Sequence, residues 1–165
     1  TAGADNHDIT GYYTAKYSNR STEEKAYEND YLMRGRYSYV PSVSVYVEGE
    51  LTDDAIKAAI KTGHSYLTNG PRLVATIGGA KYGETFALNG STSIDIDFDL
   101  FSFDQIEKIN VVKNGEVVQV ITEGFDELYY QSVLHMTGVA PGDWFVFEVI
   151  GEKTAYALTN PIFLG

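Results

Sequence analysis

The chain has 165 residues and a formal net charge of −11, because 23 Asp and Glu outnumber 12 Lys and Arg. It contains no cysteine, which excludes disulfides, thiolate zinc sites and thiol catalysis and leaves the cellular compartment open. The acidic charge is spread along the chain without a basic patch, so nucleic acid and anionic membranes are poor partners, and no apolar run approaches the ~20 residues of a membrane span.

The first eight residues contain an Asp-x-His pattern, formed by Asp5 and His7 after a run of small residues. Residues i and i+2 at a strand end point to the same side, so the carboxylate and the imidazole could reach one metal cluster. A protein-bound divalent ion needs three or more ligands, and neither His64 nor His135 has a His or acidic neighbour at ligand spacing. We therefore predict that Asp5 and His7 are the last ligands of a metal site whose other ligands precede residue 1. The alternative is a chance pattern in a loop.

Residues 8–38 are polar and lack sustained periodicity, although Thr22 and the acids after it could start a short helix. Tyrosine is the compositional outlier, and seven of the 13 tyrosines lie between Tyr12 and Tyr39. Amphipathic rings on an irregular segment can stack on sugars or line a pocket. Aromatic clusters more often serve packing, so we expect these rings to hold a loop against the rest of a catalytic domain.

In residues 39–47, Val recurs at every second position from 43 to 47, which predicts a strand. A helix is predicted from Leu51 to Gly63, with Thr52 as its cap and Gly63 as its left-handed end. A short strand over 64–68 follows and ends in an Asn-Gly-Pro turn. The apolar stripe of the helix, which should dock on another element, consists of Ile56, Ala59 and Ile60.

From Arg72 onward the pattern is typical of β-strands separated by turns. The Asn-Gly pairs at 89–90 and 114–115 predict turns, and the second pair is a strong signal for a two-residue hairpin. About eight strands are predicted, over residues 72–77, 84–88, 93–100, 106–113, 116–122, 128–136, 144–150 and 155–164. This pattern predicts a mainly β fold: an antiparallel β-sandwich, preceded by the remnant edge of an α/β barrel with one helix.

Several polar residues have a simpler role than catalysis. Asp95, Asp97 and Asp99 alternate with apolar residues, so they should lie on the solvated outer face of a strand and protect against edge pairing. The alternative is calcium binding, but calcium sites usually use a bent loop. His64 should place a favourable charge near the C-terminus of the helix. His135 should face solvent. Neither histidine is paired with a Ser or a carboxylate at a spacing that suggests catalysis.

The glycine-rich segment 78–83 links two predicted strands and opens no helix. A phosphate-binding loop needs that helix, so we expect a hairpin turn. The three aromatic residues near the end of the chain, Trp144, Phe145 and Phe147, are expected to fill the core of the sandwich.

Three parts of the chain together resemble the polymerase-and-histidinol-phosphatase family of metal-dependent hydrolases, in the branch that carries a β-sandwich after its catalytic barrel. Residues 1–7 resemble the family's late Gly-Ser-Asp-x-His motif at a barrel strand end, with Ala4 where Ser is common. Residues 55–71 resemble the branch's segment of helix, Gly, strand and Thr-Asn-Gly-Pro. The landmarks of its sandwich match Asn114-Gly115-Glu116-Val117, Trp144 and Thr159-Asn160-Pro161-Ile162.

The resemblance implies that Asp5 and His7 bind zinc, manganese or iron in a multinuclear site. Such a site activates water for the hydrolysis of phosphoesters, or occasionally of amides or carbamates. The family's early His-x-His pair and its middle Glu and His ligands have no counterpart in this chain, so we expect them upstream of residue 1. By itself the chain is then expected to hold no metal and to be inactive, with the upstream catalytic portion of the same protein as its partner.

We therefore expect residues 1–71 to be the trailing part of a catalytic barrel and residues 72–165 to be a C-terminal β-sandwich domain. The expected function is that of the C-terminal part of a metal-dependent phosphoesterase, acting in full-length form on a small-molecule or phosphoester substrate. One alternative is a carbohydrate- or protein-binding β-sandwich module without a catalytic role. Another is an accessory structural domain that binds no ligand.

Overall fold

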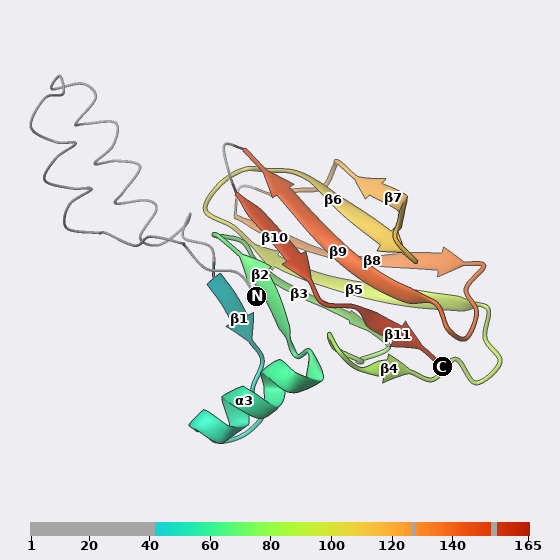
Figure 1. Cartoon of the computed structure of the whole chain (residues 1–165). Coiled ribbons are helices and arrows are strands. Elements are labelled where there is room, and N and C mark those ends of the chain that lie inside the picture. The colour runs from blue at the N-terminus through green and yellow to red at the C-terminus, as the bar shows by residue number, and fades with distance from the viewer. Residues whose placement is uncertain (1–41, 127, 153–154) are drawn as a thin grey trace, which may run out of the picture.

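The computed structural model describes residues 42–126, 128–152 and 155–165, which form two β-sheets and one helix (Figure 1). The three-stranded sheet consists of β3 (Arg72–Ile77), β5 (Ser93–Phe101) and β8 (Tyr129–Thr137), in that order. The eight-stranded sheet consists of β1 (Ser42–Val45), β2 (Ser65–Thr68), β10 (Tyr156–Thr159), β9 (Trp144–Gly151), β11 (Ile162–Leu164), β4 (Thr85–Phe86), β6 (Ile106–Lys113) and β7 (Glu116–Ile121). The mainly β, sandwich-like fold predicted from the sequence is confirmed.

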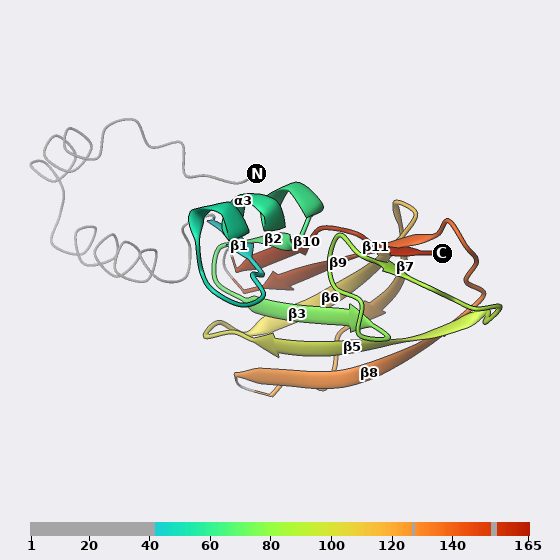
Figure 2. The same cartoon turned by 90° about the horizontal axis from the view of Figure 1, so that it is seen from below.

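The two sheets form separate layers, and the helix α3 (Asp53–Thr62) lies on the side of the larger sheet that faces away from the smaller one (Figure 2). In the larger sheet, β9 is the central strand: it pairs with β10 and β11 along one edge and with β6 along the other. The pairings described are antiparallel except that of β4 with β11, which is parallel. These two strands are far apart in sequence, so no tight hairpin imposes an antiparallel direction.

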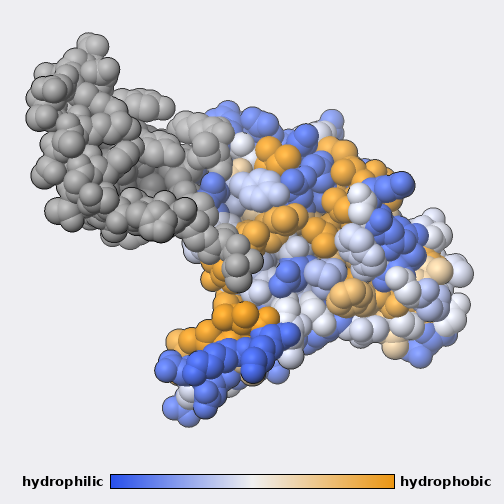
Figure 3. Space-filling view, in the orientation of Figure 1, coloured by the Kyte–Doolittle hydropathy of each residue, from blue (hydrophilic) through white to orange (hydrophobic). Residues whose placement is uncertain are grey.

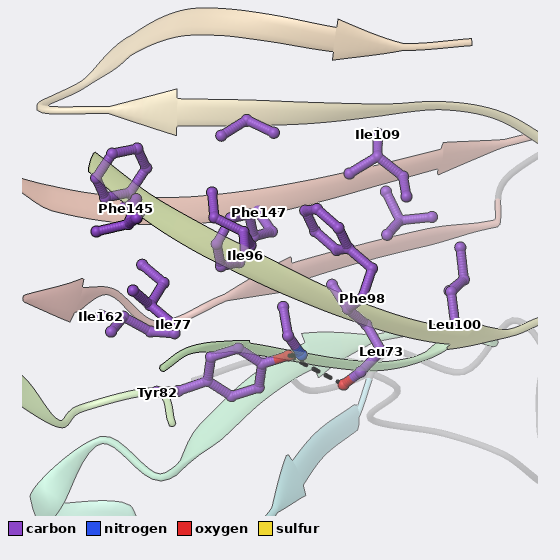
Figure 4. Packing of buried hydrophobic residues seen from close by; sticks show 14 of the residues in the cluster. Leu73, Ile77, Tyr82, Ile96, Phe98, Leu100, Ile109, Phe145, Phe147 and Ile162 are labelled. Carbon is purple, nitrogen blue, oxygen red and sulfur yellow. Dashed lines mark hydrogen bonds between the residues drawn. The ribbon is translucent and has the colours of Figure 1, made fainter. Parts of the chain in front are cut away.

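The core fills the space between the layers, because alternate residues of β3, β5 and β9 point inward (Figure 4). Phe98 of β5 and Phe147 of β9 meet across this space, with ring centroids 5.2 Å apart in an edge-to-face arrangement. The predicted alternation in β5 is confirmed, since Ile94, Ile96, Phe98 and Leu100 are buried and Asp95 and Asp97 are exposed. However, β5 is the middle strand of its sheet, so its acids do not protect an edge.

The helix begins and ends as the sequence predicts. The Thr52 hydroxyl accepts a hydrogen bond from the Ala55 N–H at 3.2 Å, and Gly63 ends the helix with φ of 80°. Figure 3 shows hydrophobic side chains along one side of α3 and hydrophilic ones along the other. The docking stripe is only partly buried, because Ala59 is buried whereas Ile60 remains 46 % exposed.

The segment that precedes residue 72 contributes strands to the sandwich. β2 pairs with β1 on one side and with β10 on the other, so residues 42–71 and 155–165 share one sheet. The boundary expected between residues 71 and 72 therefore falls in the connection between β2 and β3. Within the described part of the chain, no helix is both long and apolar enough to cross a membrane.

Two expectations about the C-terminal strands are wrong in detail. The predicted strand over 155–164 is divided into β10 and β11, because Pro161 has no N–H to donate to a sheet ladder. Trp144 is not in the core: Phe145 and Phe147 are fully buried, and Trp144 is half-buried. Since neighbouring residues of a strand point to opposite faces, Trp144 and Phe145 could not both point inward.

Candidate functional site

A pocket of about 310 Å³ lies where β1 and β2 of the larger sheet approach β3 of the smaller one. Its walls combine aromatic rings, short polar side chains and three basic groups. The lining residues are Ser44, Val45, Tyr46, His64, Ser65, Tyr66, Arg72, Leu73, Val74, Ala75, Lys81 and Tyr82. Pockets with mostly apolar walls and a few convergent polar groups are the usual form of a small-molecule site.

The turn after β3 brings Lys81 and Tyr82 into this pocket. Ile77 and Ala80 close the turn through two backbone hydrogen bonds of 3.0 Å each, as expected for the glycine-rich segment. The chain then passes so close to the end of α3 that a Cβ on Gly83 would overlap the Thr62 carbonyl. The Gly83 N–H donates to the Pro161 carbonyl at 2.7 Å. The segment therefore crosses from the smaller sheet to the larger one, and it is not a hairpin between paired strands.

Lys81 forms the charged rim of the pocket. Its Nζ lies 2.8 Å from a Glu48 carboxylate oxygen and 3.9 Å from the centroid of the Tyr46 ring. The hydrogen bond with Lys81 holds the pKa of Glu48 below its usual range, and the same bond is the main cause of the raised pKa of Lys81. Lys81 is therefore cationic over the whole physiological pH range.

Tyr82 forms the floor. Its hydroxyl accepts a hydrogen bond from the Ala75 N–H at 2.7 Å and donates one to the Leu73 carbonyl at 3.1 Å (Figure 4). Burial raises the pKa of this hydroxyl above its usual range. The ring packs edge-on against Tyr66, with centroids 6.0 Å apart. Tyr82 is thus fixed by both sheets, and its hydroxyl is fully used in structure.

His64 lies at the end of α3, as expected, but it also has a carboxylate partner that the sequence spacing did not reveal. Its Nε2 is 3.6 Å from a Glu84 oxygen. The other Glu84 oxygen accepts the Lys81 N–H at 2.8 Å, which fixes the carboxylate. The pair is formed only because the 78–84 segment docks on α3, so it could not have been found from residue spacing.

The chemistry of this pocket favours binding over catalysis. Each basic group already faces a carboxylate: Lys81 faces Glu48, His64 faces Glu84, and Arg72 lies 3.2 Å from Asp99. The buried Ser65 hydroxyl is bonded to the Asn160 amide at 3.0 Å and does not pair with His64 as an activated nucleophile would. Across residues 42–126, 128–152 and 155–165, no three His, Asp or Glu side chains gather into a group that could hold a metal ion.

The two predicted metal ligands, Asp5 and His7, lie outside the described residues. The other histidine, His135, is exposed, as expected, but it too has an acidic partner. Its Nδ1 lies 2.7 Å from Asp95 Oδ1 across the β5–β8 pairing. Residue spacing does not reveal either carboxylate partner, because strand register and loop docking join residues 40 and 20 positions apart.

A separate set of contacts joins the segments that carry the family resemblance. The Asn160 side-chain amide donates to the Gly63 carbonyl at 3.1 Å and to the Ser65 hydroxyl. Asn69 Oδ1 accepts the Tyr156 N–H at 2.7 Å, and the Asn69 N–H donates to the Tyr156 carbonyl. Both asparagines therefore connect residues 63–71 to the two ends of β10.

Comparison with family models gives no match for this chain. Comparison with curated proteins gives none either. Among solved structures, the chain is similar to an engineered protein, at 12% sequence identity and a TM-score of 0.38, over 57% of this chain and 20% of the other. The chain thus spans about a fifth of the length of that protein, and a likeness of this degree carries no functional argument.

Proposed function

We propose that this chain is the C-terminal part of a metal-dependent phosphoesterase similar to the polymerase-and-histidinol-phosphatase hydrolases. In this proposal Asp5 and His7 contribute the last ligands of the metal site, and residues upstream of Thr1 contribute the others. The observation that carries the proposal is the contact between two segments of family resemblance, 63–71 and 159–162.

These two segments resemble the family independently, and they are about ninety residues apart in sequence. In the structure Asn160 bonds directly to Gly63 and Ser65, and Pro161 accepts a hydrogen bond from Gly83 beside the end of α3. Two unrelated chance matches would have no physical reason to fall on adjacent strands. The contact between the two segments supports the interpretation that they belong to one structural unit, which follows the catalytic domain.

The donor chemistry of Asp5 and His7 fits the metals that the resemblance implies. A carboxylate oxygen and an imidazole nitrogen are suitable ligands for zinc, manganese and iron. When bound, such an ion lowers the pKa of water and so supplies the nucleophile for ester hydrolysis. Asp5 and His7 would hold the ion, and the sandwich would support the barrel or shape access to it.

The proposal is tested with the complete product of the gene, by measuring hydrolysis of bis(p-nitrophenyl) phosphate with added zinc, manganese or iron. Replacing both ligands, Asp5→Ala with His7→Ala, should lower the rate by at least ~100-fold, because loss of outer-shell partners alone costs ~10–100-fold. The matched control is Asp95→Ala with His135→Ala, which removes the same residue types from an exposed pair. Equal loss in both double variants, or no loss in the first, would refute the assignment.

A further inference from the structure

A second hollow, of about 580 Å³, opens at one end of the sandwich. It lies between the connection of β5 to β6 and the connection of β7 to β8. Its lining residues are Phe103, Gln105, Ile106, Thr122, Glu123, Gly124, Phe125, Asp126 and Leu128. Its volume is within the usual range for small-molecule sites, and it shares no lining residue with the pocket beside α3.

A row of aromatic side chains runs from the rim of this hollow to the ends of β5 and β8. Phe103 is 73 % exposed and meets the Phe101 ring edge-on at 4.8 Å between centroids. Phe101 in turn lies 5.1 Å from Tyr129, its direct partner across β5 and β8, and Tyr129 is 55 % exposed. We call Phe103, Phe101 and Tyr129 the aromatic row.

The backbone on both sides of the row is fixed by hydrogen bonds. The Ser102 N–H donates to the Leu128 carbonyl at 3.0 Å, which ties together the two connections that border the hollow. The Ser102 hydroxyl donates to the Asp104 carbonyl at 2.7 Å and accepts the Asp104 N–H, so the turn that presents Phe103 is closed around a buried serine. Exposure of Phe103 is thus built into an ordered turn.

The polar lining of the hollow selects the chemistry of its ligand. Gln105, Thr122 and Glu123 offer amide, hydroxyl and carboxylate oxygens, and the described residues that line the hollow include no Lys or Arg. Carboxylates accept hydrogen bonds from hydroxyl groups, but they repel phosphate, sulfate and uronate groups. The net charge of −11 adds to this repulsion. A hydroxyl-rich neutral ligand fits these acceptors, and an anionic ligand does not.

From this combination we propose that the hollow and the aromatic row bind a neutral saccharide. One sugar ring would stack its C–H face on Phe103, and its hydroxyl groups would donate to Glu123 and its polar neighbours. The row, which extends away from the hollow, would give further rings of an oligosaccharide a surface on which to stack. This function is additional to the proposed hydrolysis and does not depend on it.

The test is isothermal titration of the 165-residue chain with neutral hexasaccharides: β-1,4-glucan, α-1,4-glucan and β-1,4-linked N-acetylglucosamine. Polygalacturonate serves as the anionic probe. At least one neutral hexasaccharide should bind at millimolar or lower concentration, and polygalacturonate should not. If no neutral hexasaccharide binds, as expected if the row is covered by a protein surface instead, the proposal is overturned. Preferential binding of polygalacturonate overturns it as well.

Three single variants locate the binding. Phe103→Ala should weaken the affinity about tenfold by loss of ring stacking, and Glu123→Gln should weaken it severalfold. The control Val133→Ala, whose side chain is 61 % exposed elsewhere on β8, should bind as the unchanged chain does. All three positions are exposed, so circular dichroism should show an unchanged fold. Unchanged affinity in both Phe103→Ala and Glu123→Gln would place any binding elsewhere and refute the proposal.

Discussion

The side-chain amide of Asn160 donates a hydrogen bond to the Gly63 carbonyl at 3.1 Å, although 97 residues separate the two. Gly63 ends α3, and Asn160 lies in the bend between β10 and β11. Since α3 is only partly buried against the sheet, this bond is one of the few fixed points between the helix and the C-terminal strands. The Asn160 amide therefore ties the end of the helix directly to the C-terminal strands.

The first prediction concerns this amide. Asn160→Ala removes two hydrogen bonds and leaves the Gly63 carbonyl and the Ser65 hydroxyl without that donor, so the free energy of unfolding should fall by ~1–3 kcal/mol. Urea denaturation gives the value. Gln119→Ala, at an exposed position on the edge strand β7, is the control and should change the value by less than ~0.5 kcal/mol. Equal values for the two variants would mean that the Asn160 contacts contribute nothing to stability.

The second prediction concerns Gly83 and its close approach to α3. Gly83 and Gly90 have nearly the same backbone, with φ of 83° and 85°, but a Cβ would overlap Thr62 only at Gly83. Gly90→Ala should therefore cost only the ~1–2 kcal/mol of the left-handed conformation. Gly83→Ala should lower the free energy of unfolding by ~1–3 kcal/mol more than Gly90→Ala does, because the docked turn must move to make room for the Cβ. Thermal unfolding of both variants checks this difference, and equal midpoints would contradict the packing described.

The third prediction concerns stability at alkaline pH. Burial raises the pKa of Tyr82, and burial and a hydrogen bond with Glu148 raise the pKa of Tyr156 to about 12. In the unfolded chain both tyrosines lose their protons near pH ~10, before they do so in the folded chain. Their contribution is therefore complete below pH ~10, and the free energy of unfolding should fall as pH rises above that value.

Urea denaturation from pH 8 to 11 measures this fall. In Tyr82→Phe and in Tyr156→Phe the slope above pH ~10 should be smaller than in the unchanged chain, because each variant has one fewer shifted group. Tyr129→Phe is the control, since its side chain is 55 % exposed, and it should keep the full slope. If none of the three substitutions changes this slope, other groups cause the loss of stability at alkaline pH.

The fourth prediction concerns Asp143, whose carboxylate accepts hydrogen bonds from Lys113 at 2.8 Å, from the Asn114 amide and from the Ala140 N–H. The bond with Lys113 is the main cause of the lowered pKa of Asp143. The stability that this shift contributes is present above the ordinary Asp value of ~3.9 and is lost as pH falls through the lower folded value.

Asp143→Asn removes the titrating group, so the free energy of unfolding should decline less steeply below pH ~4 than in the unchanged chain. Acid titration followed by circular dichroism measures both curves. Asp97→Asn, at an exposed position on β5, should leave the steepness unchanged. If Asp143→Asn and Asp97→Asn give the same curve, the carboxylate is not held in its charged form by these contacts.

Local signals predicted much of the fold. The helix could be placed from Thr52 and Gly63 because capping depends on neighbours along the chain. The hairpin at 114–115 could be placed because both residues adopt positive φ, 52° and 90°, which Asn and Gly tolerate best. The alternation in β5 likewise reports directly which face is buried.

The candidate sites could not be predicted in the same way. The partners of His64 and Lys81, which are Glu84 and Glu48, depend on the docking of a turn against α3. The aromatic row depends on the register that places Phe101 opposite Tyr129. The spacing of residues along a sequence does not tell how a loop docks or which residues of two strands are paired. These contacts therefore appear only in the folded structure.

Metal content tests the central claim most directly. The complete product of the gene should be purified without chelators and analysed for zinc, manganese and iron by mass spectrometry. The unchanged protein and the Asp95→Ala, His135→Ala variant should hold equal amounts of metal, and the Asp5→Ala, His7→Ala variant should lose most of it. If the last variant retains the metal content of the unchanged protein, Asp5 and His7 are not ligands and the assignment as a hydrolase is contradicted.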